Sequence, residues 1–82
     1  MVQVVRLLWR ADVLAKLGSK HGVSLNDVEE ACWDHQIRAT WDLDPERGRR
    51  LFVDGRTASG RRLRVILRPT ETHGEFWVVT AF

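Results

Sequence analysis

Arginine side chains recur along the segment Arg49–Pro69, RRLFVDGRTASGRRLRVILRP, at a spacing that would gather them on one surface. Two runs rich in Leu, Val, Ile and Arg flank Thr57–Gly60, and this pattern predicts a β-hairpin. Guanidinium groups bind phosphate and carboxylate oxygens through paired hydrogen bonds. The predicted surface would therefore suit a polyanion, and a merely solvated surface is the alternative.

The register of this hairpin can be predicted, because side chains alternate between the two faces of a strand. A three-residue loop, Ala58–Gly60, pairs Thr57 with Arg61, and Gly60 suits the left-handed position that closes such a loop. The register places Asp54 opposite Arg64. It gives one apolar face, formed by Leu51, Val53, Leu63, Val65 and Leu67. The opposite face carries Arg50, Arg56, Arg62, Arg64 and Arg68.

The whole chain, residues 1–82, is expected to form a single domain with a modest core. Residues 1–46 carry five basic and eight acidic residues, whereas residues 47–82 carry eight and three, so basic charge gathers in the C-terminal part. The single cysteine, Cys32, excludes an internal disulfide and fits a reducing cytoplasm. Arg6 interrupts the first apolar stretch, so neither a signal peptide nor a membrane span is expected.

The remaining elements surround this hairpin. Ser24 is a good N-cap for a helix, and Asp27 completes a variant capping box with it. The pattern predicts a buried strand over Val2–Trp9, helices over Arg10–Lys20 and Leu25–Trp33, and further strands over Ile37–Leu43 and Glu75–Phe82. The helices should bury Val13, Leu14, Leu17, Leu25, Val28, Ala31 and Cys32. The predicted class is α+β, with two helices packed on one largely antiparallel sheet in the order β-α-α-β-β-β-β.

Four stretches of the chain resemble the BrnT-like toxins of bacterial type II toxin–antitoxin systems, which belong to the RelE/ParE-like group of folds. They are WRADVLAKLGSKHGVSLNDVEEA (residues 9–31), RLFVDG (50–55), GRRLRVI (60–66) and WVVTAF (77–82). The order and spacing of these stretches carry the resemblance, since no single one of them is specific.

The resemblance implies a RelE/ParE-like endoribonuclease fold whose activity a bound antitoxin blocks. The polar positions that match the family are Lys20 and His21 of the Lys-His-Gly turn, Arg50 at the strand start, and Arg61 of the Gly-Arg pair. Trp77 and Phe82 stand where the family commonly has basic residues, so impaired catalysis is an expected consequence. The partners implied are a cognate antitoxin and RNA, free or on the ribosome. A homodimer and a toxin–antitoxin hetero-oligomer both stay open.

Metal-independent RNA cleavage requires a base, an acid and cations around the scissile phosphate. Lys20, His21 and Glu46 are the candidates for proton transfer, and Arg50 and Arg61 for charge stabilisation. The residues expected to bind RNA are Arg56, Arg62, Arg64, Arg68 and Trp77. Each proton-transfer candidate has a simpler interpretation: His21 as a helix C-cap, Lys20 as a solvated helix end, and Glu46 as a turn residue.

Other chemistry is weakly indicated. Cys32 and His35 have the spacing of many metal-ligand pairs, but the sequence offers no second pair, so no metal and no other cofactor is expected. Of the four tryptophans, three are expected in the core, and Trp77 is the candidate for base stacking.

The leading hypothesis is a toxin subunit that acts as an endoribonuclease. Its rival is a non-catalytic module of the same fold that binds an antitoxin-like protein or RNA without turnover. A small structural domain with solvated arginines is the third alternative.

Overall fold

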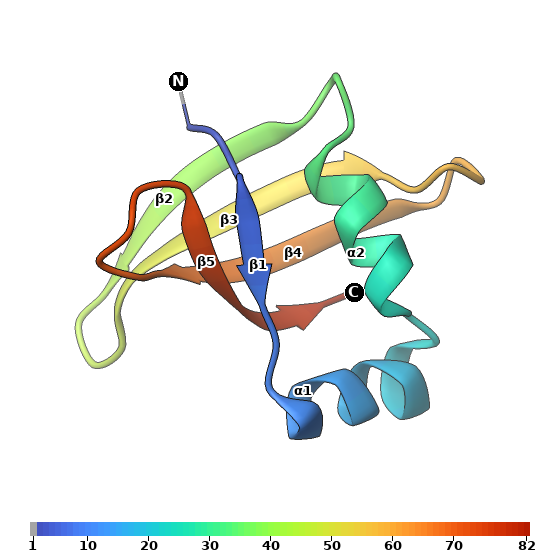
Figure 1. The fold of residues 1–82 in the computed structure, drawn as a ribbon, viewed down its shortest axis with the longest axis horizontal. Coiled ribbons are helices and arrows are strands. Elements are labelled where there is room, and N and C mark those ends of the chain that lie inside the picture. The colour runs from blue at the N-terminus through green and yellow to red at the C-terminus, as the bar shows by residue number, and fades with distance from the viewer. Residues whose placement is uncertain (1) are drawn as a thin grey trace.

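The computed structural model describes residues 2–82 as two helical segments, the first made of the consecutive elements α1 and η1 and the second of α2, packed on a five-stranded sheet (Figure 1). Along the chain the elements are β1 (Arg6–Leu8), α1 (Ala11–Lys16), η1 (Leu17–His21), α2 (Leu25–Cys32), β2 (Arg38–Asp44), β3 (Gly48–Arg56), β4 (Arg62–Pro69) and β5 (Glu75–Ala81). The strands lie in the order β1-β5-β4-β3-β2, and every pair is antiparallel except β1 with β5. The α+β class with helices on a largely antiparallel sheet is confirmed.

The central hairpin has the predicted register. Asp54 lies opposite Arg64, Val53 opposite Val65, and the loop closes with a hydrogen bond from the Thr57 amide to the Arg61 carbonyl at 2.9 Å. Gly60 takes a φ of +90°, a conformation that residues with a Cβ rarely adopt. All five predicted apolar side chains of the hairpin are buried, so the arginines necessarily lie on the other face.

The predicted capping box fixes the start of α2. The Asp27 amide donates to Ser24 Oγ at 3.1 Å, and the Ser24 amide donates to Asp27 Oδ2 at 3.0 Å, which satisfies two otherwise free helix amides. The helix then lies across β3 and β4 (Figure 1). It approaches β3 so closely at Gly55 that a Cβ there would come within 2.0 Å of the Ala31 carbonyl oxygen.

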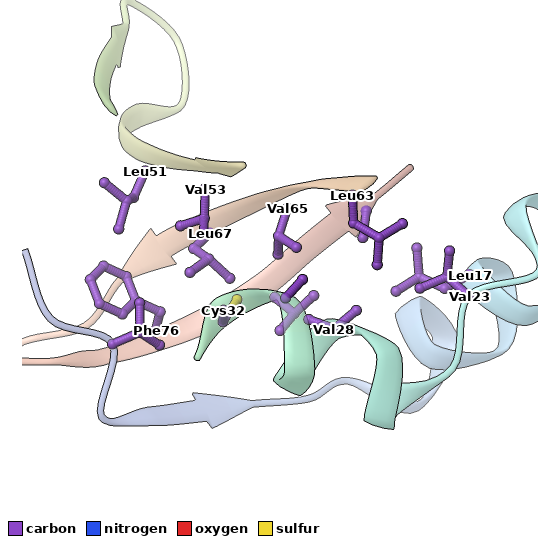
Figure 2. Packing of buried hydrophobic residues seen from close by; sticks show 14 residues of the cluster. Leu17, Val23, Val28, Cys32, Leu51, Val53, Leu63, Val65, Leu67 and Phe76 are labelled. Atoms are coloured by element: carbon purple, nitrogen blue, oxygen red, sulfur yellow. The ribbon is translucent and has the colours of Figure 1, made fainter. Parts of the chain in front are cut away.

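The core fills the space between α2, η1 and the sheet, and Figure 2 shows its side chains pointing toward one another from both layers. Its members are Val4, Leu17, Val23, Val28, Ala31, Cys32, Leu51, Val53, Leu63, Val65, Leu67, Phe76, Val78 and Ala81. Burial, helped by the negative charge of Glu29, raises the pKa of the Cys32 thiol to about 12. Cys32 is therefore an uncharged core side chain, as predicted for its helix position.

Two predictions for the N-terminal part are wrong in extent. The strand expected over Val2–Trp9 is reduced to β1, three residues that pair in parallel with β5 at the sheet edge, with Arg6 exposed and Leu7 and Leu8 only partly buried. The helix expected over Arg10–Lys20 changes at Leu17 from α to the wider π form, η1, which ends at His21 and is capped by Gly22. Of the predicted helix residues, Val13, Leu14 and Leu25 are only half-buried.

The expectation that three tryptophans lie in the core is also wrong, because none of the four is fully buried. Trp41 is on the sheet-edge strand β2, where it packs on Phe76 with ring centroids 6.2 Å apart. Trp33 follows the last residue of α2, and its indole Nε1 donates to the Val4 carbonyl at 2.7 Å. At the edge of a sheet or the end of a helix, one side of a large ring stays in contact with water, and the indole N–H can form a hydrogen bond there.

Candidate nucleic-acid interface

The face of the sheet opposite the helices is not covered by any element of residues 2–82. Because β2, β3, β4 and β5 pair in register, their outward side chains form one surface, which we call the arginine face. It comprises Arg38, Thr40, Asp42, Asp44, Arg50, Phe52, Asp54, Arg56, Arg62, Arg64, Ile66, Arg68, Trp77 and Thr80. Guanidinium groups therefore dominate this surface, with the carboxylates of Asp42, Asp44 and Asp54 among them.

One end of the arginine face is hollowed into an open depression of about 640 Å³. Its charged lining residues are Asp34, Arg38, Asp54, Arg56, Arg62 and Arg64, and Phe82 completes one wall. Arg56 and Arg62 are directly opposite each other in the β3–β4 register, and both are exposed. Four guanidinium groups against two carboxylates leave this depression with an excess of positive charge.

Arg64 is held by an ion pair. Its Nε and Nη2 donate to the two carboxylate oxygens of Asp54 at 2.8 and 3.0 Å, across the strand pair that the sequence predicted. The hydrogen bonds and charge of Arg64 lower the pKa of the Asp54 carboxyl, and Asp54 in turn raises the pKa of Arg64. Arg64 thus has a fixed position, with much of its charge already neutralised.

Arg50 is the second anchored arginine. Its Nη2 donates to Asp42 at 2.8 Å and lies 3.6 Å from Asp44, and its guanidinium stands over the Phe52 ring at 5.2 Å. Hydrogen bonds from the Glu46 and Arg47 amides, together with Arg50, lower the pKa of Asp44. Arg50 therefore ties β3 to β2 and contributes less charge to a ligand than its sequence position indicated.

Arg38, Arg56, Arg62 and Arg68 differ from this pair. Each is exposed, and none has a carboxylate within 4.0 Å in the part of the chain that the structure describes. Three of the four line the depression, and the fourth, Arg68, stands opposite Trp77 further along the sheet. The charges of Arg56, Arg62 and Arg68 are therefore the most available to a bound anion, since Arg38 lies opposite Asp54 and its charge helps to lower the pKa of that carboxyl.

Arg61 has a structural contact in addition to any role in binding. Its two terminal nitrogens donate to the carbonyls of His21 and Gly22, both at 2.9 Å, where η1 ends. The guanidinium thereby caps the helix by satisfying its C-terminal carbonyls. The simpler interpretation of the sequence had assigned this C-cap to the His21 imidazole. The imidazole instead packs beside Phe82, with ring centroids 6.2 Å apart, and so stands next to the depression.

The candidate catalytic residues lie at two ends of the sheet. Lys20, His21 and Arg61 belong to the end where the β3–β4 loop meets η1. Glu46 lies in the β2–β3 turn at the opposite end, beside a second depression of about 330 Å³ lined also by Arg47, Arg50, Arg68 and Val79. The nine residues of β3 separate the two ends by about 30 Å, so Glu46 and His21 do not face one phosphate.

Sequence reasoning missed Arg38, Asp34 and Phe82 as members of the depression. Arg38 could have been found by extending the alternation to the strand before the hairpin, where it falls on the face opposite Ala39 and Trp41. Asp34 precedes that strand in an irregular segment, where its carboxylate accepts from the Arg56 amide at 3.1 Å, and no pattern signals this contact.

No group of three or more His, Cys, Asp or Glu side chains in residues 2–82 is arranged to hold a metal ion. No helix in the same range is long and apolar enough to cross a membrane.

Comparison of the chain with protein-family models, curated proteins and solved structures gives no match. The fold and the charged surface therefore define the protein at the level of an α+β domain with a basic, uncovered sheet face.

Proposed function

We propose that the arginine face binds RNA, and that the protein is the toxin subunit of a BrnT-like, RelE/ParE-like toxin–antitoxin pair. The observation that carries the RNA proposal is the depression where Arg56 and Arg62 stand exposed beside Arg38, none of them within 4.0 Å of a carboxylate among residues 2–82. The toxin assignment is supported by the four stretches of sequence that resemble that family.

The arrangement favours a phosphate backbone over other ligands. Two unpaired arginines opposite each other on neighbouring strands repel, and an anion bridging them removes that repulsion. The anchored Arg64 beside them adds directional N–H donors at a fixed position. A polymer of phosphates can also reach Arg68 on the same face, so a chain such as RNA uses more of the surface than a single anion does.

Endoribonuclease activity would draw on His21. Its imidazole is beside Phe82 at the margin of the depression, where it could exchange a proton with the reacting 2′-hydroxyl or with the leaving oxygen. Arg56 and Arg62 would stabilise the charge that develops on the phosphorane.

Binding without turnover is the second candidate function, and one observation favours it. Glu46 and Arg50 lie at the far end of β3 from His21, so the candidate catalytic residues do not converge on one site. Arg50 is also occupied by Asp42 and Asp44. A domain with this arrangement can hold RNA, or shield it, without cleaving it.

The binding proposal is tested by fluorescence anisotropy with a labelled single-stranded RNA over a range of salt concentrations. We expect affinity to fall steeply with salt, and Arg56→Ala and Arg62→Ala each to reduce the log–log salt slope by about 0.7. The loss should be similar for RNAs of different sequence, because phosphate contacts carry no base information.

Arg10→Ala is the matched control, since it removes the same charge from an exposed arginine outside the arginine face, paired with Asp12 at 3.2 Å. If R10A and R62A weaken RNA binding equally, the change in net charge explains the loss and the arginine face is not the binding site. Binding that does not respond to salt would reject the nucleic-acid proposal.

Cleavage is measured separately, by incubating the same RNA with the wild-type chain and with His21→Ala. If the protein is an endoribonuclease, H21A should lower the cleavage rate more than the affinity, because proton transfer matters only in the transition state. Glu46→Ala should leave the rate nearly unchanged, given its distance from the depression. RNA that stays intact with the wild-type chain would support the second candidate function.

The toxin assignment has its own test in cells. Expression of the chain should arrest growth, and co-expression of the neighbouring reading frame should relieve the arrest if that frame encodes the antitoxin. Unimpaired growth would remove the toxin assignment without affecting the binding result.

A further inference from the structure

The outer edge of β2 is a long strand edge without a partner. β2 is last in the strand order, so one of its two sides pairs with β3 and no element of residues 2–82 pairs with the other. The opposite edge of the sheet is protected by its shortness, since β1 has three residues. β2 has seven residues, RATWDLD, without the proline, lysine or bulge that commonly protects an edge.

The sequence of β2 is complementary to itself when two copies run antiparallel about Trp41. In that register Arg38 of one copy lies opposite Asp44 of the other, Thr40 lies opposite Asp42, and Ala39 lies opposite Leu43. The whole strand is used, and each pair joins residues whose side chains lie on the same face. Charged residues of opposite sign meet at both ends of the strand, and apolar residues meet on the helix side.

Exposure along β2 agrees with this register. Leu43 is 74% exposed, the most exposed large apolar side chain of the described residues, and Trp41 is 40% exposed. The Trp41 ring contacts the Arg49 guanidinium, 4.2 Å from its centroid, and Phe76 of β5, so its position at the centre of the strand is fixed. Arg38 has no carboxylate within 4.0 Å in residues 2–82. Asp44 is oriented by its turn and lies 3.6 Å from Arg50, whose nearer carboxylate is Asp42 at 2.8 Å.

We propose that two copies of the chain pair through β2, edge to edge and antiparallel about Trp41, to form one continuous sheet. A second copy fits better than an unrelated strand because a two-fold axis at Trp41 produces both Arg38–Asp44 pairs at once. The axis runs through the sheet, so the helices of both copies lie on one side and both arginine faces on the other. This inference does not depend on the proposed function, although the dimer would extend the basic surface.

Analytical ultracentrifugation over a range of concentrations tests the dimer, with Leu43→Lys as the disrupting variant. In a two-fold symmetric dimer the substituted residue is present in both copies, so both Leu43–Ala39 contacts are lost. The dimer dissociation constant should therefore rise about tenfold or more. Val79→Lys is the matched control, because it adds the same charge at another exposed aliphatic residue, on β5. It should leave the dimer intact.

Asp44→Asn tests the register. The amide oxygen can still accept from the Glu46 and Arg47 amides, and Arg50 keeps its 2.8 Å contact with Asp42, so the turn and the β2–β3 ion pair are kept while the charge opposite Arg38 is lost. We expect weaker dimerisation with a smaller dependence on salt. Circular dichroism shows whether each variant is folded. The proposal is overturned if the wild-type chain stays monomeric, or if L43K dimerises as strongly as V79K. If the chain is a monomer that binds a strand of another protein at β2, that protein replaces the second copy as the partner.

Discussion

Gly55→Ala should be among the most damaging small substitutions in this chain, because it adds one methyl group where α2 touches β3. The new Cβ would stand 2.0 Å from the Ala31 carbonyl oxygen and 2.8 Å from its carbonyl carbon. Both obstacles are backbone atoms, so no side chain can rotate away. The contact must open to about 3.4 Å, and the whole helix must retreat with it.

The cost follows from what α2 contributes. It places Val28, Ala31 and Cys32 in the core, and each is at most 2% exposed. Overpacking of this kind costs about 1–3 kcal/mol, and a rigid backbone obstacle favours the upper end. A chain of this size has a total stability of about 4–12 kcal/mol. We therefore expect the melting temperature to fall by about 10–20 °C.

Urea unfolding of G55A beside Gly18→Ala measures this effect. Gly18 belongs to η1, and a Cβ there would meet no atom within 4 Å, so the same chemical change should be neutral or stabilising by up to about 1 kcal/mol. If G55A unfolds at the urea concentration of the wild type, then α2 does not lie against β3 as described. If both variants are equally destabilised, the cause is helix distortion rather than the contact with Ala31.

Three further predictions concern stability. Ser24→Ala removes the oxygen that accepts from the Asp27 amide and should cost about 1 kcal/mol by urea unfolding, against little change for the exposed Ser19→Ala. Because the pKa of Asp54 is lowered in the folded state, its ion pair stabilises the protein above the unfolded pKa of about 3.9 and is lost as the pH falls through the folded value. Asp54→Asn should therefore be less stable than the wild type at pH 6, and this difference should vanish in acid; a constant difference would contradict the assignment. Arg62→Ala should unfold no more easily than the wild type, because it relieves the repulsion from Arg56, and a clear loss of stability would mean that Arg62 holds the fold together.

The parts of the fold that the sequence predicted correctly are those set by local rules. The register of β3 with β4 follows from alternation and loop length, because a slip of one residue would bury Arg64 in place of Val65. The start of α2 follows from Ser24 and Asp27, which need only each other. The Asp54–Arg64 pair could be predicted for the same reason, since both residues belong to the hairpin.

The parts that could not be predicted depend on tertiary packing. The anchoring of Arg50 requires the register of β2, which is joined to β3 by a turn whose geometry Asp44 sets through the Glu46 and Arg47 amides. The contact of Arg61 with the His21 carbonyl spans 40 residues and has no sequence pattern. The distance between His21 and Glu46 likewise follows only from the tertiary structure, which puts them at opposite ends of β3.

The arrangement of Arg56 and Arg62 is what most separates a functional surface from a solvated one. A sheet face selected for stability alone would place opposite charges across the strands, as Asp54 and Arg64 do one pair further along β3 and β4. Arg56 and Arg62, both exposed and opposite each other, break that rule, whereas Arg38 in the same depression follows it, since it lies opposite Asp54. Local conflicts of this kind are expected where binding, rather than folding, determines the residue. If R62A is as stable as the wild type and yet binds RNA more weakly, these arginines serve a ligand. If its binding is unchanged, the arginine face is an ordinary solvated surface.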